Sequence, residues 1–92
     1  MKRRIVCAAN RYGEVVVCGA RHWDSVMSEV IGRLRGHGLC QRAQEEQGFI
    51  DQKGLFLSRE EAWMVAEAAG QIARRVGGDT INGGRLFSEN LY

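Results

Sequence analysis

The sequence predicts an α+β fold in which two β-hairpins form a small antiparallel sheet packed with two α-helices, in the order ββαββα. Two pairs of short β-prone runs, each pair separated by a polar turn, predict the hairpins. Two stretches with apolar residues at helical spacing predict the helices, one after each hairpin. We expect residues 1–92 to form a single domain, because a chain of this length buries only about 60–65% of the surface that it exposes when unfolded.

The first hairpin and the first helix occupy residues 5–38. The β-prone runs 5–9 and 14–18 lie on either side of the polar stretch 10–13, which ends in Gly13. After Gly19, apolar residues follow one another at steps of three and one, the pattern of one helix face: Trp23, Val26, Met27, Val30, Ile31 and Leu34. The glycines at 36 and 38 should end this helix.

The second hairpin and the second helix follow a polar stretch, 39–47, for which the sequence predicts no element. The runs 48–50 and 55–57 flank the turn 51–54 and predict the hairpin. Ser58 and Glu61 have the spacing of a capping box, so the helix should begin after Ser58. Its inward face should extend as far as Gly77: Ala62, Val65, Ala66, Ala69, Ile72, Ala73 and Val76. The apolar segment 86–92 should dock on the body of the domain or on a partner subunit.

Composition and charge exclude several classes of protein. Hydrophobic residues make up 45% of the chain and charged residues 26%, which is typical of a globular protein. The 13 Lys and Arg against 11 Asp and Glu leave a net charge of +2, too balanced for a nonspecific nucleic-acid binder, so we expect no DNA partner. Because no apolar run approaches the ~18–20 residues of a membrane span, we expect a cytoplasmic protein without a membrane partner. A helix-turn-helix is disfavoured because Gly77-Gly78 would cut its recognition helix to under about two turns.

The sequence carries no recognisable catalytic or metal-binding motif. It lacks G-x-S-x-G, a P-loop and any paired Asp/Glu motif. The three cysteines, Cys7, Cys18 and Cys40, have no C-x-x-C spacing. We therefore expect a protein that is not an enzyme and has no catalytic residue, cofactor or metal, and we look instead for a binding function.

Two junctions in the predicted fold could bind a ligand. Arg21 and His22 stand where the first hairpin meets the first helix, so an arginine, an imidazole and backbone donors would converge at one helix N-terminus. This arrangement suits an anion, and the alternative is that Arg21 is solvated and His22 caps the helix. Phe49 follows Gly48 in the second hairpin. An aromatic ring beside a glycine could receive a nucleotide base, and the alternative is a phenylalanine of the core.

Arg59 is expected at the first position of the second helix, where the helix macrodipole disfavours a cation. Either Glu60 and Glu61 compensate for this, or an anionic ligand binds at the same helix end. In both cases Arg59→Ala should leave the fold nearly as stable as before. Gln71 and Arg75 are weaker candidates, which lie four residues apart and would share a helix face.

Several segments together resemble a family of small proteins from tailed phages and prophages. They are C-A-A at 7–9, R-H at 21–22, Q-G-F at 47–49, G-x-F-x-x-R-E-E-A at 54–62, A-x-x-A-G-Q-I at 66–72 and L-F-S-E-N-L-Y at 86–92. The pattern is similar to that of the phage anti-Thoeris sponges, which bind cyclic ADP-ribose isomers, and in some members cyclic oligonucleotides, without degrading them. The resemblance implies an immune-evasion protein in the cytoplasm of an infected bacterium, with a small cyclic nucleotide as its ligand.

Two residues depart from the pattern of that family. Asn10 stands where the family has an aliphatic residue before the basic one, and it could shorten the first strand. Asn90 replaces an aspartate near the end of the chain. This second change removes a charge that could orient an arginine, and ligand preference would differ if that arginine were left unpaired.

Two functions follow as hypotheses. The first is a sponge whose ligand is held by Arg21, His22, Phe49, Arg59, Gln71 and Arg75. Because a chain of this size has little interior for a pocket, we expect a homo-oligomer with the ligand between subunits. The alternative is a phage inhibitor of the anti-CRISPR type, which acts through protein or RNA contact. A sponge would gather Arg21, Phe49 and Arg59 around one concavity, whereas a contact inhibitor would spread its charges over a flat or convex face.

Overall fold

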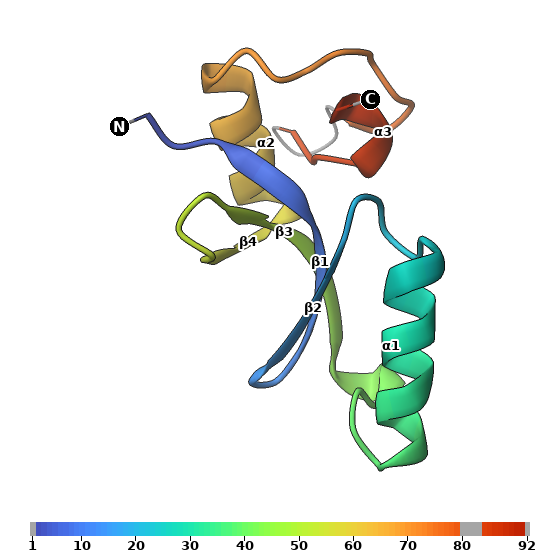
Figure 1. The fold of residues 1–92 in the computed structure, drawn as a ribbon. Helices are drawn as coiled ribbons and strands as arrows, with labels where there is room; N and C mark the ends of the chain where they lie inside the picture. The colour runs from blue at the N-terminus through green and yellow to red at the C-terminus, as the bar shows by residue number, and fades with distance from the viewer. Residues whose placement is uncertain (1, 80–83, 92) are drawn as a thin grey trace.

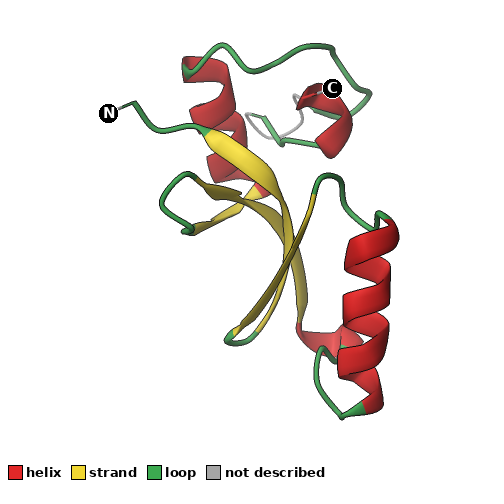
Figure 2. Ribbon diagram, in the orientation of Figure 1, coloured by secondary structure: helices red, strands yellow, loops and turns green. Residues whose placement is uncertain are grey.

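The computed structural model describes residues 2–79 and 84–91 and shows a four-stranded antiparallel sheet with the strand order β2-β1-β3-β4 (Figures 1 and 2). The strands are β1 (Ile5–Tyr12), β2 (Val15–Gly19), β3 (Glu45–Asp51) and β4 (Phe56–Ser58). The helices are α1 (Ser25–Gly36), α2 (Arg59–Ala68) and the short α3 (Ser88–Leu91), with a 3-10 turn, η1 (Arg42–Gln44), before β3. The predicted α+β class and the order ββαββα are confirmed, and α3 is an addition. In the described ranges no helix combines the length and apolarity of a bilayer span.

Strands β1 and β3 are longer than the sequence predicted, whereas β2 and β4 have the predicted length and are shifted by one residue. β1 continues through Asn10, which pairs with Val17 on one side and Gln47 on the other, so the expectation that Asn10 shortens this strand is wrong. The turn that follows has two residues and places Gly13 at a φ of 64°, as such tight hairpins require. β3 begins at Glu45, within a polar stretch for which the sequence predicted no element. The polar side chains of this part of β3 form hydrogen bonds and ion pairs with other elements. Such partners cannot be identified from the neighbouring sequence.

Helix α2 is shorter than predicted, because it ends at Ala68 rather than near Val76. Gly70 has a φ of 70° and takes the left-handed conformation that commonly ends a helix. The backbone N–H of Gln71 donates to the carbonyl of Ala66 at 2.8 Å, which closes this end. Residues 71–79 therefore form an irregular segment that leads away from the helix.

The core lies on one face of the sheet, under both helices and the C-terminal segment. Helix α1 contacts β2, whereas α2 contacts β3 and β4, and Figure 1 shows α2 and α3 together at one end of the sheet. The buried side chains of this core include Ala8, Tyr12, Val17, Met27, Ile31, Phe49, Leu57, Ala62, Trp63 and Leu86. Because Leu86 is fully buried in this cluster, the C-terminal segment docks on its own chain.

Candidate functional site

His22 lies in the interior between the sheet and α3. Its ring Nε2 is 2.7 Å from the carbonyl oxygen of Gly48, and Nδ1 is 2.6 Å from the hydroxyl oxygen of Ser88. A carbonyl can only accept, so Nε2 carries the proton and Nδ1 accepts from the Ser88 hydroxyl. Burial, and then the nearby charge of Arg59, lower the pKa of His22 to about 4, so the ring is neutral near pH 7. Both ring nitrogens are thus engaged in joining the sheet to α3.

Asp24, rather than His22, caps helix α1. The Asp24 carboxylate accepts hydrogen bonds from the backbone N–H of Met27 at 2.8 Å and of Ala20 at 2.9 Å. These N–H groups, and that of Met27 above all, hold the pKa of Asp24 below its ordinary value. Arg21 is exposed in the loop before this cap, and its carbonyl accepts from the Asp24 N–H at 3.2 Å. The helix N-terminus at which we expected an anion is therefore occupied by a carboxylate of the chain itself.

Phe49 belongs to the core, as the alternative interpretation of the sequence held. Its side chain is fully buried, and the edge of its ring meets the His22 ring with centroids 4.9 Å apart. A nucleotide base cannot reach it in this structure. Gly48 makes room for Phe56 of the neighbouring strand, because a Cβ at this position would collide with the Leu57 carbonyl oxygen and the Phe56 ring.

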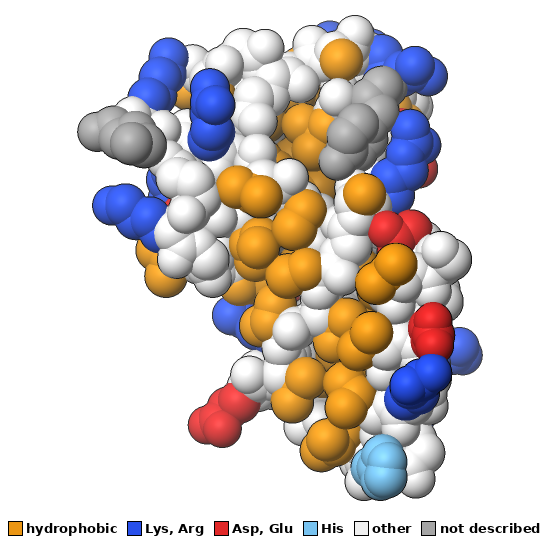
Figure 3. Space-filling model, in the orientation of Figure 1, with side chains coloured by type: hydrophobic (Ala, Val, Ile, Leu, Met, Phe, Trp, Pro, Cys, Tyr) orange, Lys and Arg blue, Asp and Glu red, His pale blue; other side chains and the backbone are white. Residues whose placement is uncertain are grey.

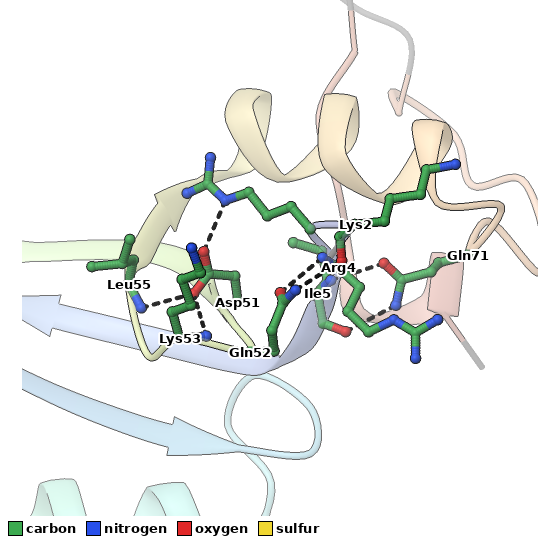
Figure 4. Close-up of polar contacts among 9 residues, drawn as sticks. Lys2, Arg4, Ile5, Asp51, Gln52, Lys53, Leu55 and Gln71 are labelled. Atoms are coloured by element: carbon green, nitrogen blue, oxygen red, sulfur yellow. Dashed lines mark hydrogen bonds and ion pairs between the residues drawn. The ribbon is translucent and has the colours of Figure 1, made fainter.

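Gln71 and Arg75 do not share a helix face, because both follow the end of α2. The side-chain amide of Gln71 binds the backbone of Ile5, accepting from its N–H and donating to its carbonyl, each at 2.8 Å (Figure 4). Arg75 donates to both carboxylate oxygens of Asp79 at 2.9 and 2.8 Å. The Arg75 guanidinium, and after it the Val76 N–H, hold the pKa of Asp79 well below its usual range. Both predicted ligand residues thus stabilise the segment that follows α2.

Asn90 belongs to the same cluster as Arg75 and Asp79. Its fully buried amide accepts from the Phe87 N–H at 2.8 Å. The amide nitrogen donates to the Arg74 carbonyl at 2.9 Å and to the Asp79 carboxylate at 3.1 Å. The Asn90 amide therefore leaves no cation unpaired here. An aspartate at 90 would lack these two donors and would place a second carboxylate beside Asp79, so the residue is explained by packing rather than by a ligand.

Arg59 anchors the C-terminal segment to the start of α2. Its guanidinium donates to the Leu86 carbonyl at 2.7 Å and to the Gln47 side-chain oxygen at 2.6 Å. It also lies 4.8 Å from the centroid of the Phe87 ring. Burial, and then the charge of Arg85, lower the pKa of Arg59. These contacts explain why a cation is tolerated at a helix end that disfavours one.

A concavity of about 360 Å³ opens beside Arg59 at the N-terminal end of α2. Arg85 reaches the same Phe87 ring, with its guanidinium carbon 5.7 Å from the centroid. The Nε of Arg85 is buried and makes no hydrogen bond to the described residues, and the nearest acidic oxygen, on Glu60, is 3.6 Å away. The concavity is lined by Glu45, Glu46, Gln47, Ser58, Arg59, Glu60 and Arg85. Two guanidinium groups and one aromatic ring therefore meet at this helix end.

Two of the three carboxylates of the concavity are paired with residues outside it. Glu45 accepts from the Tyr12 hydroxyl at 2.7 Å, and its carboxylate lies 3.5 Å from Arg35. Glu46 forms an ion pair with Arg11 on the adjacent strand. The third, Glu60, forms an ion pair with Arg85 at 3.6 Å, whereas the Arg59 guanidinium donates to the uncharged oxygens of Leu86 and Gln47.

Of the six residues predicted to bind a ligand, Arg59 alone lines this concavity. Phe49 lies in the core, His22 lies half-buried between the sheet and α3, and the other three lie elsewhere. Arg85 and Phe87, which contribute to the site, were missed because the sequence showed only an apolar C-terminal segment. The run Arg85-Leu86-Phe87 contains the signal in hindsight, since an arginine next to a buried residue must find partners nearby.

Two other concavities of about 300 Å³ each are less suited to a ligand. One is lined by Arg3, Asp51, Gln52, Lys53 and Leu55. There the Asp51 carboxylate binds Arg3 at 2.8 Å and two backbone N–H groups of its own turn, so the charges compensate each other (Figure 4). The other is lined by Ile5, Val6, Gln71 and Leu91. Within residues 2–79 and 84–91, no cluster of three or more His, Cys, Asp or Glu could hold a metal ion.

Comparison with known proteins gives one match. No curated protein and no solved structure matches the chain. The family described as "Phage T4 y16D protein" matches residues 4–92, which is nearly the whole length. The resemblance to a family of small phage proteins is therefore confirmed at that level, whereas its narrower form, the anti-Thoeris sponges, stays a prediction. This chain belongs to the phage T4 y16D protein family.

Proposed function

We propose that this protein binds a cyclic nucleotide messenger in the cytoplasm of an infected bacterium and sequesters it without cleaving it. One observation carries the proposal: the guanidinium groups of Arg59 and Arg85, which both line the concavity, meet at the ring of Phe87. The planar donor fork of arginine suits a phosphate, and a half-exposed aromatic ring suits a base. The resemblance to the anti-Thoeris sponges supports the same ligand class.

The position of the concavity also favours an anion. The macrodipole at a helix N-terminus attracts negative charge, and α2 begins at Arg59, after the Ser58 cap. A volume of about 360 Å³ lies at the lower end of the range for small-molecule sites, about 300–1,000 Å³. We therefore expect the phosphates and one base to be bound, with the rest of the ligand exposed to solvent.

Calorimetric titration with a panel of cyclic ADP-ribose isomers and cyclic di- and trinucleotides tests the proposal. Arg85→Ala should weaken binding of the preferred nucleotide by about ten- to a hundredfold, the loss of one charge-assisted contact. Arg33→Ala is the matched control, because it also removes one arginine but lies on exposed α1, paired with Glu29. Heating the complex should release the nucleotide intact. Cleaved product, equal affinity in the two variants, or no binding to any nucleotide of the panel would contradict the proposal.

An inhibitor of the anti-CRISPR type remains the second candidate function. The observation in its favour is that the large exposed apolar side chains are not among the residues that line the concavity: they lie on β1, β2, α1 and α2 and in the loops that contain Trp23, Leu39 and Leu55. Such side chains suit contact with another protein better than contact with a nucleotide. Co-purification with a Cas complex, together with no nucleotide binding, would replace the sponge by this alternative.

A further inference from the structure

Among the residues that the structure describes, no strand lies along the outer edge of β2. There β2 pairs only with β1, and the tight turn makes Tyr12 and Val15 a hydrogen-bonded pair. Because hydrogen-bonded and non-hydrogen-bonded pairs alternate along an antiparallel ladder, Val16 and Cys18 direct their N–H and C=O groups away from β1. These are the groups that another strand could pair with.

Apolar side chains flank this edge on the open face of the sheet. Val16 is 41% exposed, and Cys18 next to it on the same face is also exposed. Edge strands are commonly protected by a lysine, a proline or a bulge, and Val15–Gly19 contains no charged residue, no proline and no shift in register. Strand β2 therefore lacks the features that prevent another strand from pairing with its edge.

Helix α1 continues the apolar surface on the other side of the edge. Val26 and Val30 are 61% and 39% exposed, although they adjoin the buried Met27 and Ile31 on the helix. The opposite flank of α1 carries Arg35, which reaches Glu45 of β3. Successive residues of a helix are rotated by 100°, which places Val26 and Val30 on the flank of α1 opposite Arg35. That flank faces β2. Figure 3 shows a band of hydrophobic side chains that runs down this side of the molecule over β1, β2 and the adjoining part of α1.

We propose that this surface binds a second copy of the same chain, with the two β2 strands paired antiparallel about a two-fold axis at Val17. Val16 of each copy would then lie opposite Cys18 of the other copy. The outward N–H and C=O groups of both residues would therefore find partners on the second strand. The two sheets become one continuous sheet, and the Val26–Val30 flanks of the two α1 helices cover each other. A second copy is favoured because Glu14 precedes the strand and Arg21 follows it, so antiparallel pairing brings unlike charges together.

This dimer is independent of the proposed nucleotide site. The concavity is lined from β3, β4, α2 and the C-terminal segment, and none of its lining residues belongs to β2 or α1. Each copy keeps its own concavity, so the expectation of a ligand pocket between subunits does not apply to this interface. Either proposal can fail without the other.

The oligomeric state of two matched variants tests the interface. Val26→Lys and Met64→Lys each place a lysine at an exposed helical position, but Met64, 69% exposed, lies on α2. At roughly 100 μM, where weak dimers are populated, light scattering should show a dimer for the native chain and for Met64→Lys. Val26→Lys should be monomeric, with an unchanged circular dichroism spectrum. A monomeric native chain, or a Val26→Lys variant that dimerises like Met64→Lys, would overturn the proposal.

Amide hydrogen exchange locates the contact at the residue level. The N–H groups of Val16 and Cys18 should exchange slowly in the native protein at high concentration and at least tenfold faster in Val26→Lys. The N–H of Val17, which faces β1, should be protected in both. Rapid exchange of Val16 and Cys18 in a native dimer would show that the copies meet elsewhere, and a native monomer that captures a host protein on this face would assign the surface to that partner instead.

Discussion

At the scale of single residues, side chains that suggested a ligand prove to hold distant segments together. His22 joins the sheet to α3 through both ring nitrogens, and Gln71 binds the backbone of Ile5 at the edge of the sheet. Polar side chains in these roles resemble ligand residues in sequence, because both roles use the same donors and acceptors. Only the position of their partners distinguishes them.

The protonation of His22 should make stability depend on pH. Its pKa is about 4 in the folded chain and 6.5 ordinarily, so the unfolded chain binds the extra proton between these values. The free energy of unfolding should therefore be highest above about pH 6.5 and fall as the pH drops toward about 4. The full shift would give about 3 kcal/mol, and solvent screening of the half-buried ring reduces this to roughly half. Urea denaturation across this range measures the fall.

His22→Gln is the control for this pH dependence. Carboxylates of the chain contribute to acid sensitivity in both proteins, so the difference between the two curves isolates the imidazole. The variant should be less stable near neutral pH but flatter between about pH 4 and 6.5. Parallel curves would mean that His22 does not titrate as its surroundings imply.

Arg59 should contribute to stability as well as to ligand binding. Arg59→Ala leaves the Leu86 carbonyl and the Gln47 amide without their partner, which should cost about 1–3 kcal/mol. The earlier expectation of an unchanged fold came from the helix dipole alone. For a chain of this size the melting temperature should fall by about 4–8 °C for each kcal/mol. Arg33→Ala, at an exposed ion pair, should change it little, and equal melting of the two variants would contradict the anchoring role.

At the scale of elements, the sequence patterns correctly predicted the features that depend on residues close together along the chain. The capping box is present as expected: the Glu61 N–H donates to the Ser58 hydroxyl, and the Ser58 N–H donates to the Glu61 carboxylate. The first part of β3 was not predictable, because the hydroxyl of Tyr12, 33 residues away, stabilises Glu45 there. The ligand site depends even more on such contacts, since Arg59 reaches Phe87, and Arg85 reaches Glu60, only after the C-terminal segment docks.

Two glycines on the helices should respond in opposite ways to the same substitution. Gly70→Ala forces a side chain into the left-handed conformation that ends α2, which should cost about 1–2 kcal/mol. Gly32→Ala lies inside α1, where a Cβ meets nothing within 4 Å, and should stabilise the protein by about 0.5–1 kcal/mol. Chemical denaturation of both variants measures the signs. A stabilising Gly70→Ala would mean that α2 can extend toward Val76.

At the scale of the whole molecule, the domain is closed by contacts between the first and last parts of the chain. His22 meets Ser88, and Ile5 meets Gln71, each across 66 residues. Gly84 lies so close to Trp63 of α2 that a Cβ there would collide with the indole ring. The C-terminal segment thus contributes buried side chains to the fold, whereas its composition predicted only that it would dock on the domain or on a partner subunit.

That closure has a consequence for the nascent chain. A ribosome delivers the polypeptide from its N-terminus, so both hairpins and α2 emerge before Leu86 and Ser88 can take their places. Until then the core is incomplete, and His22 lacks the hydroxyl that it meets in the finished fold. Chains in this condition expose apolar surface and aggregate readily. The sheet and α2 can therefore complete their packing only after the last residues of the core have been synthesised.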